Sequence, residues 1–384
     1  MYKQSILSGL MMATITLIFP SIAHGVPCQL INRKANDIYH IFPSCGVKLL
    51  AQTNQPASKK LNELLKQGRE LVEAGNYQLA IAVYQRAINL DPKNAQIYSG
   101  IAYLEARQEN FPVAAQFYQR AIAIDPNNAN FQYGLGYSMA KLENYEAAVA
   151  AYRRASVLDK NNVNAHLGLG VVFFRQEKYN EAITAYQGAI QSNPKNAEAH
   201  AAIGLVLLKQ RRFPEALAAI QQAVQLSPRD AGIQINLGTA LLATGDIDGG
   251  LNALKMASRL EPRNADLQLQ IAEIYKQQDN SQAALKAYQI AVNINPDLLE
   301  ARLAVAEILF EGEDYLQAII RYREIIRRNP DNADAHYKMA LALQARERKR
   351  EALDHLETAL KLFEEQDDYE GEEKVKTAIE ELKD

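Results

Sequence analysis

The chain has 384 residues, of which 48% are hydrophobic and 23% charged, and its formal net charge is -3. This nearly neutral balance gives the protein as a whole no electrostatic reason to seek nucleic acid, so we predict no nucleic-acid partner. A hydrophobic fraction of this size without any tryptophan is typical of alanine-rich helical packing.

The amino terminus has the three regions of a secretory signal peptide. Lys3 supplies the cation, residues 6–19 form an uncharged apolar run, and small residues follow Pro20 at alternate places, at Ala23 and Gly25. We therefore expect residues 1–25 to be cleaved and the protein to be exported to a periplasmic or lumenal space. The alternative is a membrane anchor, which the shortness of the apolar run disfavours because a spanning helix needs about 20 residues.

The chain contains two cysteines, Cys28 and Cys45, and both precede the repetitive part of the sequence. An even pair in an exported chain predicts a disulfide, which would stabilise the segment by about 3 kcal/mol through loop entropy. We expect residues 26–58 to form a stapled segment and linker beside the first repeat. Two unrelated free thiols are the alternative.

The rest of the sequence repeats with a period of 34 residues. Proline marks the period, with Lys160 in one place of the series; its other members are Pro92, Pro126, Pro194, Pro228, Pro262, Pro296 and Pro330. Each unit holds two helix-periodic apolar segments separated by a polar turn, which predicts a helix-turn-helix. Nine units fit within residues 59–366, namely 61–94, 95–128, 129–162, 163–196, 197–230, 231–264, 265–298, 299–332 and 333–366.

Small residues recur where two helices must approach closely. Position eight of each unit is Gly or Ala, position twenty is Ala except for Gly250, and a tyrosine often holds position twenty-four. With the pair Leu169-Gly170, the alanines, the aromatic residue and the closing proline, the pattern resembles the tetratricopeptide repeat. The resemblance implies an all-α fold, a right-handed α-solenoid of helix-turn-helix repeats.

The last residues, 367–384, are acidic and predict a final helix. Its apolar positions Val375, Ala378, Ile379 and Leu382 share one face. A polar-backed helix of this kind would close the last hairpin, as the end of a solenoid requires. The basic eighth and ninth units precede it, and opposite charges so close in sequence favour a cap over a nucleic-acid patch.

The first helix of each unit has one face turned away from its hairpin, at positions two, five, nine, twelve and thirteen. The resemblance places this face on the concave side of the solenoid. The predicted groove residues are Tyr103, Tyr133, Tyr137, Leu167, Val171, Phe174, Leu205, Leu208 and Ile235, edged by Arg107, Lys141, Arg175 and Lys209. This pattern suits a peptide with apolar anchors and acidic residues. The alternative is that some of these side chains pack between adjacent first helices.

Two further features limit the choice of partner. The Lys/Asn/Arg clamp with which related cochaperones hold a carboxyl terminus is absent, since Leu65, Gly100 and Gly134 occupy clamp positions. From the sixth unit on, the same face turns polar, for example at Glu273 and Glu307. That half offers either a second docking surface or simply a solvated face.

No catalytic or cofactor motif occurs in the sequence. His166 and His200 sit at the same inward position of adjacent units, and a structural role is favoured over a metal site because nothing completes a ligand set. The glycines around Gly136 and Gly170 lie within predicted helices, so they indicate packing and no dinucleotide. We therefore predict no enzyme, no cofactor and no metal.

Together these features predict a non-catalytic, exported bacterial scaffold that binds a protein or peptide partner. We expect it to assist assembly or maintenance of an envelope or membrane complex. Two alternatives stay open. One is a carbohydrate-binding or polysaccharide-export accessory whose tyrosines stack on sugars, and the other is a targeting subunit of a separate enzyme.

Overall fold

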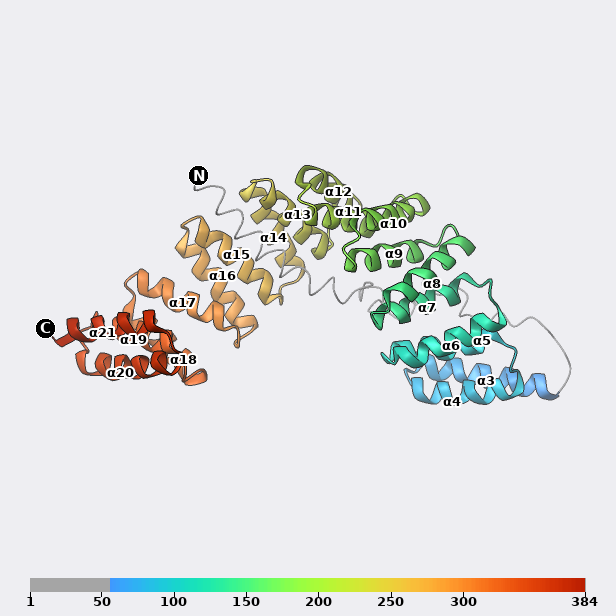
Figure 1. Ribbon diagram of the computed structural model, residues 1–384, viewed down its shortest axis with the longest axis horizontal. Helices are drawn as coiled ribbons and strands as arrows, with labels where there is room; N and C mark the ends of the chain where they lie inside the picture. The colour runs from blue at the N-terminus through green and yellow to red at the C-terminus, as the bar shows by residue number, and fades with distance from the viewer. Residues whose placement is uncertain (1–55, 384) are drawn as a thin grey trace. The chain divides into compact units, whose positions relative to one another are not determined.

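The computed structural model describes residues 56–383, and every regular element in that span is an α-helix. The helices follow one another as pairs (Figure 1), which confirms the predicted all-α repeat fold. None of these helices is long and apolar enough to cross a membrane. The predicted signal segment, Cys28 and Cys45 lie outside the described residues.

The chain divides into two units, one ending at Asp246 and the other beginning at Ile247. The helices of unit 1 are α3 (Pro56–Glu73), α4 (Tyr77–Leu90), α5 (Ala95–Arg107), α6 (Phe111–Ile124), α7 (Ala129–Lys141), α8 (Tyr145–Leu158), α9 (Val163–Arg175), α10 (Tyr179–Ser192), α11 (Ala197–Lys209), α12 (Phe213–Leu226) and α13 (Ala231–Ala243). Those of unit 2 are α14 (Ile247–Leu260), α15 (Ala265–Gln277), α16 (Ser281–Ile294), α17 (Leu299–Glu311), α18 (Tyr315–Arg328), α19 (Ala333–Gln344), α20 (Lys349–Glu365) and α21 (Tyr369–Lys383). We call α5, α7, α9, α11, α13, α15, α17 and α19 the A helices.

The boundary between the two units lies inside the predicted array of nine repeats. It falls within the sixth repeat, where Ile247 replaces the aromatic residue that usually begins the second helix. Gly249 and Gly250 follow, and each costs a helix about 1 kcal/mol relative to alanine. The second helix of the sixth repeat is therefore the one that its own sequence favours least.

Asparagine at the last position of a repeat starts the next A helix. Asn162 accepts a hydrogen bond from the backbone N–H of Ala165 at 2.9 Å, and Asn196 accepts one from Ala199 at 2.7 Å. A cap of this kind stabilises a helix by about 1 kcal/mol. Because the cap recurs with the 34-residue period, every A helix that has it begins in the same register.

Tyr152, at position twenty-four of the third repeat, fills the gap between the two A helices α7 and α9. A Cβ atom added at Gly136 on α7 would lie 2.7 Å from the Tyr152 ring, and one added at Gly168 on α9 would lie 2.5 Å from it. No Cβ tolerates such a contact, so both glycines are required by the ring. Tyr152 is fully buried there, which confirms that the ring packs between neighbouring hairpins.

The final helix α21 closes unit 2 as predicted. Val375, Ala378 and Leu382 are buried against the core of the ninth repeat, and Gly371 allows the ring of Phe363 to approach. The acidic residues of α21 instead pair with lysines of the same helix, for example Glu370 with Lys374 at 2.7 Å. A capping helix therefore buries the apolar end of the last hairpin.

Candidate functional site

The A helices of unit 1 carry all thirteen predicted groove residues, and the structure separates these residues into two groups. Tyr133, Leu167, Leu205 and Leu208 are buried, none more than 8% exposed. They contribute to the hydrophobic cores of the repeats, as the alternative interpretation expected. We therefore omit these four side chains from the contact surface.

The other nine side chains are only partly buried. We call them the inner face of unit 1: Tyr103, Tyr137, Val171, Phe174, Ile235, Arg107, Lys141, Arg175 and Lys209. They lie at the same few repeat positions on α5, α7, α9, α11 and α13. The repeat thus brings aromatic, aliphatic and cationic side chains onto one side of these helices.

Two cations of the inner face, Lys141 and Arg107, lie against aromatic rings. Lys141 Nζ is 5.7 Å from the centroid of the Tyr137 ring and 6.0 Å from that of Phe111, and the two rings meet edge to face at 6.1 Å. A cation over an aromatic ring is stabilised by about 0.5–1 kcal/mol at an exposed site. Tyr137 and Lys141 are therefore held in place before any ligand arrives.

The same arrangement occurs one repeat earlier. Arg107 donates a hydrogen bond from Nη2 to the Tyr77 hydroxyl at 3.0 Å, and its guanidinium carbon lies 5.6 Å from the centroid of that ring. Tyr77 precedes Arg107 by 30 residues, just as Phe111 precedes Lys141. Further along the face, desolvation lowers the pKa of Lys209 while Glu177 acts in the opposite direction. A position-thirteen cation therefore stands in a partly dehydrated setting, where its charge is less screened than in water.

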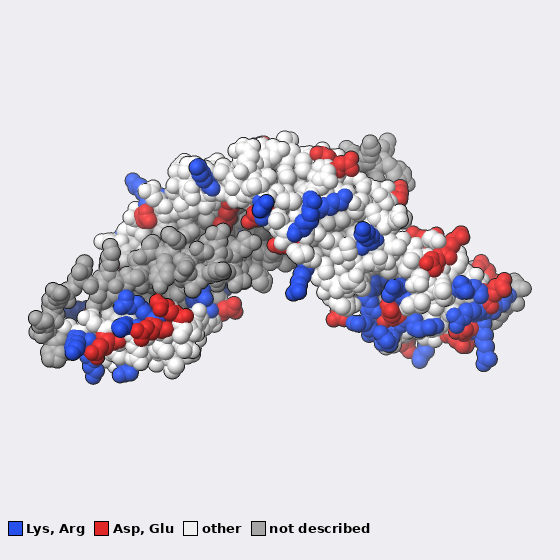
Figure 2. Space-filling model, turned by 180° about the vertical axis from the view of Figure 1, so that it is seen from behind, with Lys and Arg blue, Asp and Glu red and all other residues white. Residues whose placement is uncertain are grey.

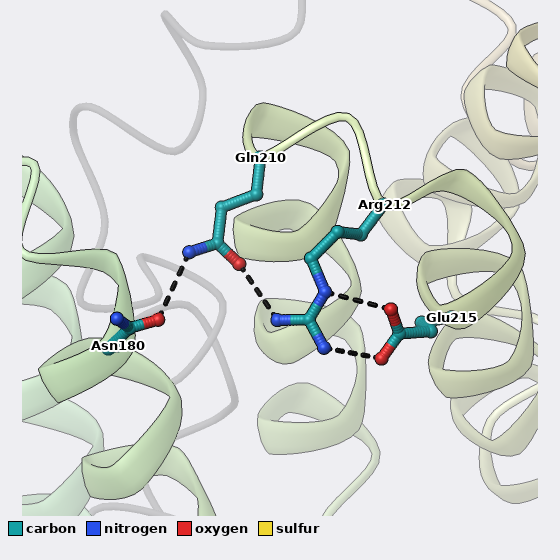
Figure 3. A network of polar contacts seen from close by, with 4 residues as sticks. All are labelled: Asn180, Gln210, Arg212 and Glu215. Carbon is teal, nitrogen blue, oxygen red and sulfur yellow. Dashed lines mark hydrogen bonds and ion pairs between the residues drawn. The ribbon is translucent and has the colours of Figure 1, made fainter.

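Beside the cations, polar side chains in the turns of the repeats form hydrogen bonds with one another. Gln210 donates to Asn180 of the preceding repeat at 3.2 Å and accepts from Arg212 at 3.1 Å, while Arg212 also holds Glu215 through two hydrogen bonds (Figure 3). The pair raises the pKa of Arg212 and lowers that of Glu215. Gln78 and Gln108 join the first two repeats in the same way. Hydrogen bonds between neutral amides and the Arg212–Glu215 ion pair thus stabilise this edge of unit 1.

A cluster of tyrosines lies behind the inner face. The rings of Tyr133 and Tyr152 are 5.7 Å apart, and burial raises the pKa of both. The buried hydroxyl of Tyr152 has no hydrogen-bond partner in the described part of the chain. An unsatisfied buried hydroxyl costs about 1–3 kcal/mol, so this group is unusual for a protein core.

Glu198 acts on buried tyrosines electrostatically, and it was not among the predicted groove residues. Desolvation raises the pKa of Glu198 to about 7, with Asp230 acting in the same direction. Its charge in turn raises the pKa of Tyr133 and Tyr186, which stand on other repeats. Glu198 occupies position two of its repeat, which belongs to the outward face, so the periodicity did contain a signal for it.

Comparison with known families agrees with the repeat pattern. A profile described as tetratricopeptide repeat matches residues 65–129, 133–196, 167–231, 235–298 and 303–367, which is well over half of the chain. A second profile of the same description matches residues 207–260. The chain belongs to the tetratricopeptide repeat family. The tetratricopeptide fold supports a role as a scaffold for protein–protein interaction.

Solved tetratricopeptide structures resemble parts of this one. One from Parabacteroides merdae ATCC 43184 covers 65% of this chain and 99% of its own, with 14% identity and a TM-score of 0.51. Pseudomonas aeruginosa PilF covers 58% of this chain and 100% of its own, with 19% identity and a TM-score of 0.49. YrrB, described as having an unusual peptide-binding site, covers 50% and 98%, with 26% identity and a TM-score of 0.41. The first likeness is one of fold alone. None of the curated proteins matches the sequence.

In unit 2 the corresponding face of the tetratricopeptide A helices is ionic. Glu307 on α17 lies 3.6 Å from Lys276 on α15 and 3.2 Å from Lys338 on α19. Glu273 accepts a hydrogen bond from the hydroxyl of buried Tyr288. The charges of this face therefore pair with one another across three consecutive repeats.

The histidines at position four have structural contacts. His200 Nε2 lies 3.4 Å from the Pro194 carbonyl oxygen, and His336 Nε2 lies 3.2 Å from that of Pro330. Each A helix is thereby tied to the closing proline of the preceding tetratricopeptide repeat. Within residues 56–383 no group of three His, Cys, Asp or Glu side chains is arranged to hold a metal ion.

Proposed function

We propose that this protein is an interaction scaffold whose inner face in unit 1 binds an extended or helical peptide segment of a partner protein. The observation that carries the proposal is the pairing of partly exposed aromatic rings with cations in successive repeats. Tyr137 with Lys141 and Tyr77 with Arg107 are its best-defined members. Aromatic residues and arginine are the side chains that most often dominate binding energy at protein interfaces.

The pre-positioning of these groups favours binding. Phe111 and Lys141 both lie against the Tyr137 ring, and Tyr179 lies 5.9 Å from Phe174, ring centre to ring centre. Side chains that are already fixed lose little conformational entropy when a ligand docks. We propose Tyr137 and Phe174 as the central apolar anchors, with Tyr103, Val171 and Ile235 extending the contact along the A helices.

The charges indicate what kind of peptide fits. Arg107, Lys141, Arg175 and Lys209 supply one cation per repeat along one edge of the inner face. Charge complementarity then calls for acidic residues in the peptide, spaced between its apolar anchors. Replacing Arg107 and Lys141 by Gln should slow association and weaken its dependence on salt, because cations at an interface rim mainly steer the encounter.

The proposed cellular role rests on the amino-terminal sequence. A cation, an apolar run and small residues before Val26 support export, and we propose that the partner belongs to an envelope or membrane complex. Amino-terminal sequencing of the mature protein tests this. A start near Val26 is expected, and a start at Met1 would mean a retained membrane anchor.

The experiment for the binding face is a selection of displayed random peptides on the full chain, followed by titration of the enriched peptides. We expect sequences that alternate apolar and acidic residues. The double substitution Tyr137→Glu with Phe174→Glu should abolish their binding while the circular dichroism spectrum stays unchanged. Lys276→Glu, at the same repeat position as Phe174 but in unit 2, is the matched control and should bind normally.

The outcomes separate the candidate functions. Undiminished peptide binding by the double variant would remove the inner face from the account. Binding on a glycan array without any peptide enrichment would favour the carbohydrate alternative, in which the tyrosines stack on sugars. Turnover of a substrate by co-purified material, but not by the isolated chain, would favour a targeting subunit.

A further inference from the structure

Unit 2 contains a small cavity that is separate from its A-helix ion pairs. It lies between α16, α17 and α18 and has a volume of about 70 Å³. Two arginines, Arg302 and Arg321, line it together with Gln289, Asn293, Glu324 and two valines. Cationic and amide side chains of this kind can all donate hydrogen bonds into one space.

Arg302 is a buried cation with few partners. Its side chain stands at position four of the eighth repeat, where the ninth repeat carries the neutral His336, and it is only 8% exposed. Its Nη2 donates to the backbone carbonyl of Glu324 at 2.6 Å, and no carboxylate of the described residues lies within ion-pair distance. A buried guanidinium without a counter-ion is costly, and an anion in the cavity would offset that cost.

Arg321 adds a second set of donors. Its Nη1 donates to the Glu324 carboxylate at 3.2 Å, but its buried Nε has no hydrogen-bond partner within residues 56–383. The cavity thus has two guanidinium groups and one carboxylate. Burial lowers the pKa of Arg302. The nearby cations Arg328 and Arg327 act in the same direction, and the carboxylates of Glu324 and Asp297 act in the opposite direction.

Asp297, the other carboxylate close to Arg302, is not available to neutralise the arginines of the cavity. Arg328 is paired with Asp297 at 2.5 Å, so that carboxylate is already engaged. Acidic and basic side chains are interspersed over the C-terminal part of unit 2 (Figure 2). Within the cavity itself, the two lining arginines exceed the one lining carboxylate.

We propose that this cavity binds one oxyanion group, a carboxylate or a phosphate, through the guanidinium groups of Arg302 and Arg321. Guanidinium is planar and presents its N–H groups as a fork that matches both kinds of anion. The cavity is large enough for a single such group, and Gln289 and Asn293 also line it. Glu324 weakens the site because its charge repels the anion. The site lies in the other unit from the peptide-binding face, so each can fail without the other.

The test follows the arginine side chains directly. The full chain is labelled with ¹⁵N-arginine, and sodium phosphate and sodium acetate are titrated separately at constant ionic strength with chloride as the reference. The Nε–H signals are assigned with Arg302→Lys and Arg321→Lys. We expect the Arg302 and Arg321 signals to shift and saturate, whereas the exposed Arg86 on α4 follows the chloride reference.

Two variants sharpen the result. Glu324→Gln should lower the apparent Kd by about two- to fivefold, since it removes one nearby like charge at a partly exposed position. Arg321→Gln should abolish saturation at Arg302. Saturation with phosphate alone identifies a phosphate site, and saturation with acetate alone identifies a site for a carboxylate. Shifts at Arg302 and Arg321 that stay linear and no larger than that of Arg86 in both titrations would overturn the proposal.

Discussion

The A-helix faces of the two units differ although the same repeat builds both. At position twelve, unit 1 has Phe174 where unit 2 has Lys276, and at position nine it has Tyr137 where unit 2 has Glu307. In unit 2 these charged residues satisfy one another, whereas in unit 1 rings and cations stand partly exposed. The positions that pack hairpins together are thus similar in both units, and the positions that packing leaves free distinguish them.

The two units also differ in the hydrogen bonding of their buried tyrosines at position twenty-four. Tyr288 in unit 2 donates its hydroxyl proton to Glu273, while the hydroxyl of Tyr152 in unit 1 has no partner in the described chain. The residue that decides this is at position nine, Glu273 in one repeat and Tyr137 in the other. Unit 1 therefore leaves polar capacity unsatisfied close to its proposed binding surface.

The largest expected effect concerns the glycines at position six, which unit 1 uses to admit tyrosine rings. Gly168→Ala would place a Cβ 2.5 Å from the Tyr152 ring, so we expect the free energy of unfolding to fall by about 1–3 kcal/mol. Gly100→Ala is the matched control, because its Cβ would lie 3.8 Å from Tyr84. That variant should gain up to about 1 kcal/mol from helix propensity. Urea unfolding measures both, and equal effects would contradict the packing account.

The hydroxyl groups give the next effect. Tyr288→Phe removes a hydrogen bond to a carboxylate and should cost about 1.5 kcal/mol. Tyr152→Phe removes a buried hydroxyl without a partner and should raise the free energy of unfolding by about 1 kcal/mol, because the desolvation cost of that group disappears. Chemical denaturation of the two variants separates the units. A comparable loss in Tyr152→Phe would mean that this hydroxyl is satisfied in solution.

Glu198 predicts a pH dependence in unit 1. Its pKa of about 7 in the folded protein lies above the ordinary value of 4.5, so the folded state keeps a proton that the unfolded chain releases. The contribution of Glu198 to the free energy of unfolding is therefore greatest below about pH 4.5 and falls as the pH rises to about 7. Glu198→Gln should flatten that part of the profile of urea midpoints. Glu215→Gln, at an exposed ion pair, is the control that should keep it.

The smallest effect is expected at the ionic face of unit 2. Glu307→Gln breaks contacts with Lys276 and Lys338, but about a third of the Glu307 side chain is exposed and water screens the pairs. We expect a loss of less than about 1 kcal/mol that shrinks at high salt. Thermal unfolding at low and high salt tests this. A salt-independent loss would mean that Glu307 acts through packing.

The repeat made the fold predictable, because prolines, alanines and glycines at fixed offsets specify where helices end and touch. The turns were less predictable: Glu109 and Glu177 have positive φ values of 62° and 58°, where glycine would be expected. The face was predictable as a set, but Tyr133 and Tyr137, one helical turn apart, differ in burial. That difference depends on how far side chains of neighbouring repeats reach.

The ring–cation pairs and Glu198 also show which features the sequence predicts and which depend on the fold. Tyr77 and Arg107 are 30 residues apart, an offset that recurs for Phe111 and Lys141 and was readable in principle. Glu198 became distinctive only when the fold brought it close to tyrosines of two earlier repeats. Periodicity gives a residue its face, whereas its electrostatic setting comes from contacts between repeats.

The most direct test of the central claim compares one repeat position in the two units. The photoreactive residue p-benzoylphenylalanine is placed at Phe174 or at Lys276 in the full chain, and each protein is irradiated with the selected peptides. We predict a covalent adduct at Phe174 and none at Lys276, because only the inner face of unit 1 is open to a peptide. Adducts of equal yield at both positions, or an adduct at Lys276 alone, would contradict the account.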